Sequence, residues 1–150
     1  MSLLDILKAQ DVIVPLQAQD KRGAIKELIQ LFKKNGKIAD VEDAYDAVMT
    51  REEKASTGLE NGIAVPHAKT AAVHNIAAAI GISPQGIEFG SLDGAPANLI
   101  FLIIAPPAQS GAHIALLSEI ARLTKYSTLC DDLADAKNAE QVISILHGEE

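Results

Sequence analysis

The chain has 150 residues, which fits one domain, residues 1–150, with a hydrophobic core of its own. Its composition is 48% hydrophobic and 22% charged, with 3% aromatic residues and no tryptophan, which is typical of a globular protein with an aliphatic core rather than of a disordered chain. The formal net charge of -7 opposes binding to nucleic acids and to anionic membrane surfaces, because both need clustered Lys and Arg.

The first residues and the longest apolar run indicate the compartment. The opening MSLLDILKAQ contains Asp5 and lacks the basic stretch of a signal peptide. The longest apolar run, Leu99 to Ala105, is far shorter than the roughly 20 residues of a membrane span. The single cysteine, Cys130, has no disulfide partner and no CxxC neighbour, so we interpret it as structural rather than as a redox thiol. We expect a cytoplasmic protein without membrane insertion.

The first two predicted elements are short. Residues 2–8 are typical of a short helix with Ser2 as N-cap and Asp5 at the third position. Val12 to Leu16 is predicted to be extended, and Pro15 confines it to a sheet edge or a turn.

Two amphipathic helices and two extended segments are predicted next. The first helix runs from Asp20 to Asn35, and the second begins at the N-cap Asp40 and ends near Arg51. The extended segments are residues 62–65 and 76–82, and the sequence SPQG is expected to turn the chain after the second one.

The last third of the chain contains the clearest strand. LIFLII, residues 99–104, is a continuous apolar run between turn signals, as in a strand buried on both faces at the centre of a sheet. A helix over residues 110–126 is predicted with Ser110 as cap, and Asn138 with Gln141 opens the last helix. Because helices and strands interleave, the sequence predicts an α/β domain whose helices cover a mostly buried sheet.

GIAVPHAK, residues 62–69, presents a candidate nucleophile. Pro66 removes a backbone donor and restricts Val65 to extended geometry, so we expect the strand ladder to stop where His67 appears. A neutral imidazole is a competent nucleophile near pH 7, whereas lysine is mostly protonated and serine needs a base. The pattern also fits an ordinary turn histidine bonded to backbone or water.

Two further residues are candidates for holding an anion beside His67. His113 falls in the first turn of the predicted helix at Ser110, where free backbone N–H groups favour an anion and a neutral imidazole. Arg51 carries a guanidinium whose fork matches phosphoryl oxygens. The alternatives are an exposed first-turn histidine and an arginine that stabilises a helix C-terminus.

Other chemistries have little support. Lys54 and Lys69 are interpreted as solvated surface lysines, and His74 and His147 lie outside the predicted site. The histidine spacing contains no HxxxH or HExxH pair for zinc. The sequence also lacks the glycine-rich loops of nucleotide sites and the GxSxG elbow of hydrolases. We therefore expect no metal and no cofactor.

The segment REEKASTGLENGIAVPHAK, Arg51 to Lys69, resembles the active-site signature of the type-2 enzyme IIA domains of the bacterial phosphoenolpyruvate-dependent phosphotransferase system. That family has fructose, mannitol and nitrogen-regulatory members. The similarity covers nearly the whole chain, because SLDGAPANLIFLIIAP and AHIALLSEIARL also have counterparts there. One departure is Glu60, where many members carry a small residue, and an acid near a phosphate bears on partner preference.

The resemblance implies a fold and a set of roles. The fold would be α/β, with a mixed β-sheet of about five strands flanked by helices on both faces. His67 would accept a phosphoryl group at Nε2 from the phosphohistidine of the carrier protein HPr or its nitrogen-branch paralogue. His113 would lie beside His67, and Arg51 would help to hold the phosphoryl oxygens.

Two functions stay open on this resemblance. A phosphocarrier would pass the group from His67 to a cysteine of enzyme IIB for sugar uptake. A nitrogen-regulatory IIA would instead use the phosphorylation of His67 to control binding to target proteins, because a phosphoryl group adds roughly -1.5 to -2 charges at pH 7. We expect a free-standing IIA without a fused IIB or IIC region, which fits both functions.

Overall fold

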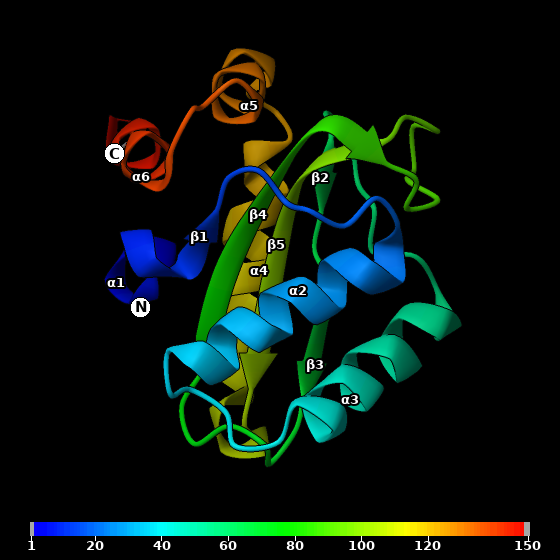
Figure 1. Ribbon diagram of the computed structural model, residues 1–150, viewed down its shortest axis with the longest axis vertical. Helices are drawn as coiled ribbons and strands as arrows, with labels where there is room; N and C mark the ends of the chain where they lie inside the picture. Colours follow the sequence, from blue (N-terminus) through cyan, green and yellow to red (C-terminus); the bar gives the residue numbers. More distant parts are fainter. Residues whose placement is uncertain (1, 149–150) are drawn as a thin grey trace.

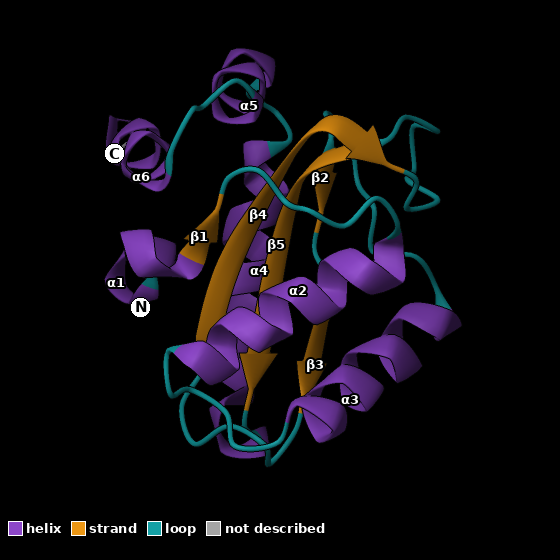
Figure 2. Cartoon of the chain, in the orientation of Figure 1, coloured by secondary structure: helices purple, strands orange, loops and turns teal. Residues whose placement is uncertain are grey.

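The computed structural model describes residues 2–148, which form one mixed β-sheet between two layers of helices (Figures 1 and 2). The helices are α1 (Leu3–Ile6), α2 (Lys21–Lys34), α3 (Val41–Lys54), α4 (Ser110–Leu123), α5 (Ser127–Ala134) and α6 (Ala139–Gly148). The strands are β1 (Val12–Ile13), β2 (Ile63–Ala64), β3 (His67–Lys69), β4 (Ala77–Ile87) and β5 (Ala97–Ala105). Two short 3-10 helices are η1 (Ala9–Asp11) and η2 (Pro107–Gln109).

The sheet has the order β1-β4-β5-β2, and β3 also pairs with β5. Strands β4 and β5 are antiparallel, whereas β1 runs parallel to β4 and both β2 and β3 run parallel to β5. Helices α2 and α3 cover one face and α4 crosses the other (Figure 1). The expected mixed sheet of five strands flanked by helices is therefore confirmed.

Strand β5 lies at the centre of the core, as its apolar run predicts. Its side chains alternate between the two faces, and both faces are buried. Ile100, Leu102 and Ile104 pack with the residues of α2 and α3, whereas Leu99, Phe101 and Ile103 belong to the cluster that contains α4, α5 and α6. A side chain on a strand beside β5 therefore faces either the α2–α3 layer or the α4 layer, according to its register.

Four of the predicted helix starts are confirmed by capping hydrogen bonds. Asp20 accepts a hydrogen bond from the backbone N–H of Gly23 at 2.7 Å, and Asp40 accepts one from Asp43 at 3.1 Å. The backbone N–H of Ser2 donates to Asp5 at 2.7 Å in front of α1. The same type of bond, 2.9 Å from the N–H of Gln141 to Asn138, precedes α6.

Three predictions about element ends are wrong. Helix α3 continues to Lys54, because Glu52 is buried on it and extends the helix beyond Arg51. Helix α4 has Gln109 at its N-cap, so Ser110 is its first residue, and it ends at Leu123. The following residues form a separate helix, α5, whose buried residues are Leu129, Cys130 and Leu133.

The segment SPQG does not end its strand. Strand β4 continues through these residues to Ile87 with a shift of register after Ile82. Gly86 supplies the positive φ of 85° that the irregularity needs, and the side-chain amide of Asn98 on β5 donates to the carbonyl of Ser83 at 2.9 Å. The cross-strand contact therefore overrides the local turn signal.

Cys130 is buried, as a structural cysteine should be. Burial and the neighbouring carboxylate of Asp131 raise the pKa of its thiol to about 11, and its Sγ donates to the carbonyl of Leu123 at 3.3 Å. Across residues 2–148, none of the helices is both long and apolar enough to cross a membrane.

Candidate functional site

His67 is placed by a strand that is interrupted but stays in register. Ile63 and Ala64 pair with Leu99 and Ile100, and His67 then pairs with Ile103 at the same offset. The expectation that the ladder stops at the histidine is therefore wrong. Pro66 lacks an N–H, so one rung is lost, but its carbonyl accepts from the N–H of Ile103 at 3.1 Å and the ladder resumes.

This register turns His67 toward α4. Side chains alternate along a strand, so Ile63, Val65, His67 and Lys69 share the face that is covered by α4. Ala64 and Ala68 point to the opposite face and pack with the α2–α3 layer. The alternation places the His67 imidazole and the Lys69 ammonium group on the same face of the edge strand.

The His67 ring has a defined tautomer. Its Nδ1 lies 2.8 Å from the carbonyl oxygen of Val65. A carbonyl can only accept, so Nδ1 carries the hydrogen and Nε2 keeps an unshared electron pair. Burial is the main cause that lowers the pKa of His67 below its ordinary value, with Arg51 adding to it while the Val65 carbonyl and Glu52 oppose it. The ring is therefore neutral and nucleophilic near pH 7.

His113 lies directly beside His67. The ring centroids are 5.4 Å apart with an angle of 70° between the planes. His113 is 4% exposed, and its Nε2 is buried without a hydrogen-bond partner among the described residues. Burial, followed by the charges of His67 and Lys69, lowers its pKa to about 4. A neutral ring with an unused nitrogen thus lies next to the candidate nucleophile, and its burial removes the alternative of an exposed first-turn histidine.

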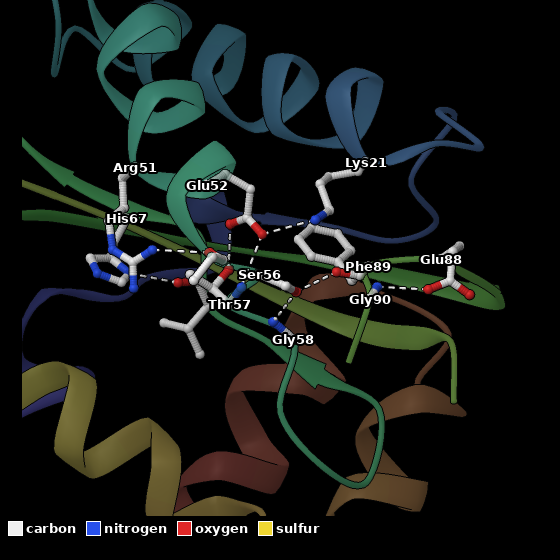
Figure 3. A network of polar contacts seen from close by, with 12 residues as sticks. Lys21, Arg51, Glu52, Ser56, Thr57, Gly58, His67, Glu88, Phe89 and Gly90 are labelled. Atoms are coloured by element: carbon white, nitrogen blue, oxygen red, sulfur yellow. Dashed lines mark hydrogen bonds and ion pairs between the residues drawn. The ribbon is translucent and has the colours of Figure 1, made fainter. Parts of the chain in front are cut away.

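A cavity of about 350 Å³ connects the two histidines to α3. Its charged or titratable lining residues are Arg51, Lys54, His67, Lys69 and His113. The side chain of Arg51 lies next to His67 (Figure 3), and its Nη1 donates to the carbonyl of Ala55 at 3.0 Å. The structure therefore brings together the three residues that the sequence nominates, Arg51, His67 and His113.

Two exposed lysines also belong to this cavity. Lys54 and Lys69 are exposed, as expected of surface lysines, but both line the cavity as well, and the Nζ of Lys69 lies 3.4 Å from the Oγ of Ser110 at the start of α4. The sequence spacing could have predicted that both lysines lie near the candidate site. Lys54 is three residues from Arg51 on a helix and Lys69 is two residues from His67 on a strand, so each shares a face with its neighbour.

The arrangement suits an anion rather than a metal. Three cationic side chains surround two neutral imidazoles, in a chain whose formal net charge is -7. Over the described part of the chain, no group of three or more His, Cys, Asp or Glu is placed to hold a metal ion. A tetrahedral oxyanion at the Nε2 of His67 would meet the fork of Arg51 and the lysine ammonium groups.

A polar network behind His67 contains a residue that the sequence reasoning missed (Figure 3). The side chain of Glu52 is 2% exposed and accepts hydrogen bonds from Lys21 and Thr57. A carboxylate beside Arg51 on a helix gives no sequence signal of burial, because charged residues in a last helical turn are mostly solvated. Glu60, the departure from the family pattern, is exposed and does not line the cavity.

Comparison with known proteins identifies a family for this chain. The family model described as phosphoenolpyruvate-dependent sugar phosphotransferase system, EIIA 2, matches residues 5–148, which include His67, His113 and Arg51. The fructose-specific EIIA component from Haloferax volcanii is 36% identical over 126 residues, covering 84% of this chain and 82% of that protein. The fructose-specific EIIABC component from Bacillus subtilis is 33% identical over 147 residues, which are 98% of this chain but 23% of that longer protein.

A solved structure shows the same fold. The crystal structure of the nitrogen regulatory protein IIA-Ntr from Neisseria meningitidis matches with a TM-score of 0.88 at 26% identity. The match covers 96% of this chain and 98% of that one, so the sheet and both helical layers are shared.

Proposed function

Because this chain belongs to the EIIA type-2 family of the phosphoenolpyruvate-dependent sugar phosphotransferase system, we propose that it is a phosphocarrier that accepts a phosphoryl group on His67 and passes it on. The observation that carries this proposal is the Nδ1 bond from His67 to Val65, which leaves Nε2 free in a cavity lined by cations. The donor would be the phosphohistidine of HPr or of its nitrogen-branch paralogue, and the acceptor a cysteine of enzyme IIB.

The acceptance step needs positioning more than covalent chemistry. The Nε2 lone pair of His67 attacks the phosphorus in line while the N–P bond of the donor breaks, and the donor imidazole leaves. The neutral ring required for attack is favoured by the lowered pKa of His67. Because the bond formed resembles the bond broken, the step is nearly balanced and reversible, as a relay requires.

The cavity supplies the charge stabilisation. Arg51 would turn from the Ala55 carbonyl toward the phosphoryl oxygens, and Lys54 on α3 and Lys69 on β3 would add positive charge. The unpartnered Nε2 of His113, carrying a hydrogen, would donate to one phosphoryl oxygen. Each contact would speed the transfer to the extent that it is stronger in the transition state than in the ground state.

The test is phosphoryl transfer with a direct readout of the acceptor. The protein is incubated with enzyme I, HPr and phosphoenolpyruvate, and its intact mass is measured. We expect one acid-labile, base-stable phosphoryl group on the wild type and none on His67→Ala. His74→Ala, which alters an exposed histidine outside the cavity, is the matched control and should be labelled like the wild type. Labelling of His67→Ala would end the proposal.

A regulatory function is the second candidate, and the likeness to the nitrogen regulatory protein IIA-Ntr favours it. In that case the phosphoryl group on His67 would switch the charge of the cavity and thereby the binding of target proteins. Competition between HPr and its nitrogen-branch paralogue as donors separates the two functions. Preference for HPr together with transfer to an enzyme IIB cysteine supports sugar uptake, whereas preference for the paralogue without transfer to IIB supports regulation.

A further inference from the structure

Glu52 is a buried carboxylate beside the site but outside the cavity. Its Oε2 accepts from the Nζ of Lys21 and from the backbone N–H of Thr57, both at 2.9 Å, and its Oε1 accepts from the hydroxyl of Thr57 at 2.6 Å. All three partners donate, so each carboxylate oxygen accepts at least one hydrogen bond. A buried charge is costly to desolvate, and the ion pair with Lys21 and the two hydrogen bonds from Thr57 offset this cost, so they hold the loop that contains Thr57 against α3 and α2.

The fixed loop in turn holds the backbone next to His67. The carbonyl of Thr57 accepts from the N–H of Val65 at 3.1 Å, and the carbonyl of Val65 accepts from the Nδ1–H of His67 at 2.8 Å. The carbonyl of Pro66 bonds to β5, so the Val65 peptide groups point away from β5 and rely on Thr57. Hydrogen bonds from Thr57 to Glu52, from Val65 to Thr57 and from the ring to Val65 therefore link Glu52 to His67. Figure 3 shows Glu52, Thr57 and His67 in this arrangement.

We propose that Glu52 is a positioning residue: through Thr57 and Val65 it holds His67 in the tautomer whose Nε2 is free to accept the phosphoryl group. This role rests on the proposed function of His67. Without a fixed Val65 carbonyl the neutral ring can carry its hydrogen on either nitrogen, and the form with hydrogen on Nε2 cannot attack.

The placement of Glu52 separates this role from direct catalysis. Arg51 and Glu52 are consecutive on α3, and consecutive helical residues point in different directions. Arg51 lines the cavity with His67, whereas Glu52 faces Lys21 at the start of α2 and lies near Glu88 in a different depression. Glu52 therefore lies outside the lining of the cavity, and besides its charge, which opposes the lowering of the His67 pKa, it reaches the ring through the backbone of residues 57 and 65.

The first experiment measures the tautomer without any transfer. The side-chain nitrogen chemical shifts of His67 are recorded by NMR at neutral pH in the unphosphorylated full chain. We expect the wild type to show hydrogen on Nδ1 alone, and Glu52→Gln to show a mixture of both tautomers, because the amide replaces one acceptor oxygen with a donor. The matched control is Glu53→Gln, which removes an exposed carboxylate paired with Arg22 at 3.2 Å and should leave the shifts unchanged.

The second experiment measures acceptance from phosphorylated HPr. Glu52→Gln should lower kcat by about 10-fold and leave KM for the donor unchanged, because the docking surface is intact while the reacting nitrogen is misplaced part of the time. If Glu52→Gln does not fold, Thr57→Val removes one of the three hydrogen bonds and should change the shifts and kcat in the same direction by less, with Thr57→Ser restoring them.

The outcomes distinguish this inference from the proposed function. The positioning role would be overturned if the folded Glu52→Gln variant gave the same His67 chemical shifts as the wild type. If Glu52→Gln does not fold, the same result in Thr57→Val would overturn it. Equal changes of the chemical shifts in Glu53→Gln would also overturn it. A wild type that never takes up phosphoryl from HPr would defeat the proposed function, yet the NMR comparison would still decide whether Glu52 sets the tautomer.

Discussion

The two edges of β5 differ in a way that locates the site. On one edge β4 pairs with β5 from Ala77 to Ile82 without a break, and this stretch is buried throughout. On the other edge β2 and β3 together form a strand with a gap at Val65 and Pro66, and it ends in exposed or half-buried groups. The uninterrupted edge contributes apolar packing, whereas the interrupted edge carries His67 and Lys69 of the candidate site.

The interruption does two things at once. The register is kept, so His67 and Lys69 point to the α4 layer as they would on a continuous strand. The outward peptide groups of Val65 become available to Thr57 and to the His67 ring. The edge strand can therefore hold the His67 ring in a defined orientation while leaving it half-buried, because the proline removes only one rung.

The largest effect is expected from a change on the uninterrupted edge. Ile80 is 1% exposed on β4 and pairs with Phe101, so Ile80→Ala leaves a cavity in the core. We expect the free energy of unfolding to fall by about 2–5 kcal/mol, measured by urea denaturation. Phosphoryl acceptance per folded molecule should stay at the wild-type rate. A large loss of acceptance at a temperature where the variant is fully folded would contradict the separation of the two edges.

The same contrast explains what the sequence could and could not predict. The central strand, the capped helices and the residues Arg51, His67 and His113 follow from local patterns of apolar runs, capping side chains and a proline before a histidine. Strand pairing resumes at His67 because His67 pairs with Ile103, which lies 36 residues further along the chain. The buried carboxylate of Glu52 depends on an ion pair with Lys21, which belongs to another helix. Such long-range partners leave no local signal, so these features could not be predicted.

The second prediction concerns the imidazole that faces the interrupted edge. His113→Ala removes the proposed donor to the phosphoryl oxygen, and we expect acceptance from phosphorylated HPr to slow by about 100-fold without being abolished, since His67 remains the acceptor. Rapid-quench measurement of the phosphorylated fraction gives the rate. His113→Gln should recover part of it, because an amide can still donate. Unchanged rates in both variants would assign His113 to packing alone.

The third prediction uses the pH dependence of stability. The pKa of His113 is about 4 in the folded protein, against an ordinary value of 6.5, so below pH 6.5 the unfolded chain binds a proton that the folded chain does not. Stability should therefore decrease as the pH falls from about 6.5 to about 4, and the contribution of His113 should be about 1–3 kcal/mol. His67 and Lys69 are the titratable groups whose charges lower this pKa, and His67 itself shifts in the same direction.

The quantity to measure is the difference between two proteins in how their free energy of unfolding changes with pH, because carboxylates also titrate in this range. Urea denaturation of the wild type and of His113→Gln at several pH values isolates the histidine. We expect the wild type to lose more stability on acidification than the variant does. Parallel curves would show that the pKa of His113 is not depressed by folding.

The smallest effect is expected from a cation at the rim of the same edge. Lys69 shares the face of His67 on β3 but is exposed, so solvent screens its attraction for a phosphoryl group. Lys69→Gln should slow acceptance by about 3-fold at low salt, and the difference should shrink as salt rises because the charge is screened. Lys34→Gln, which changes an exposed lysine at the end of α2, keeps the net charge of the two variants equal. Equal slowing in both variants would mean that the donor responds to overall charge, whereas slowing confined to Lys69→Gln would place a phosphoryl contact on the strand that resumes after the proline.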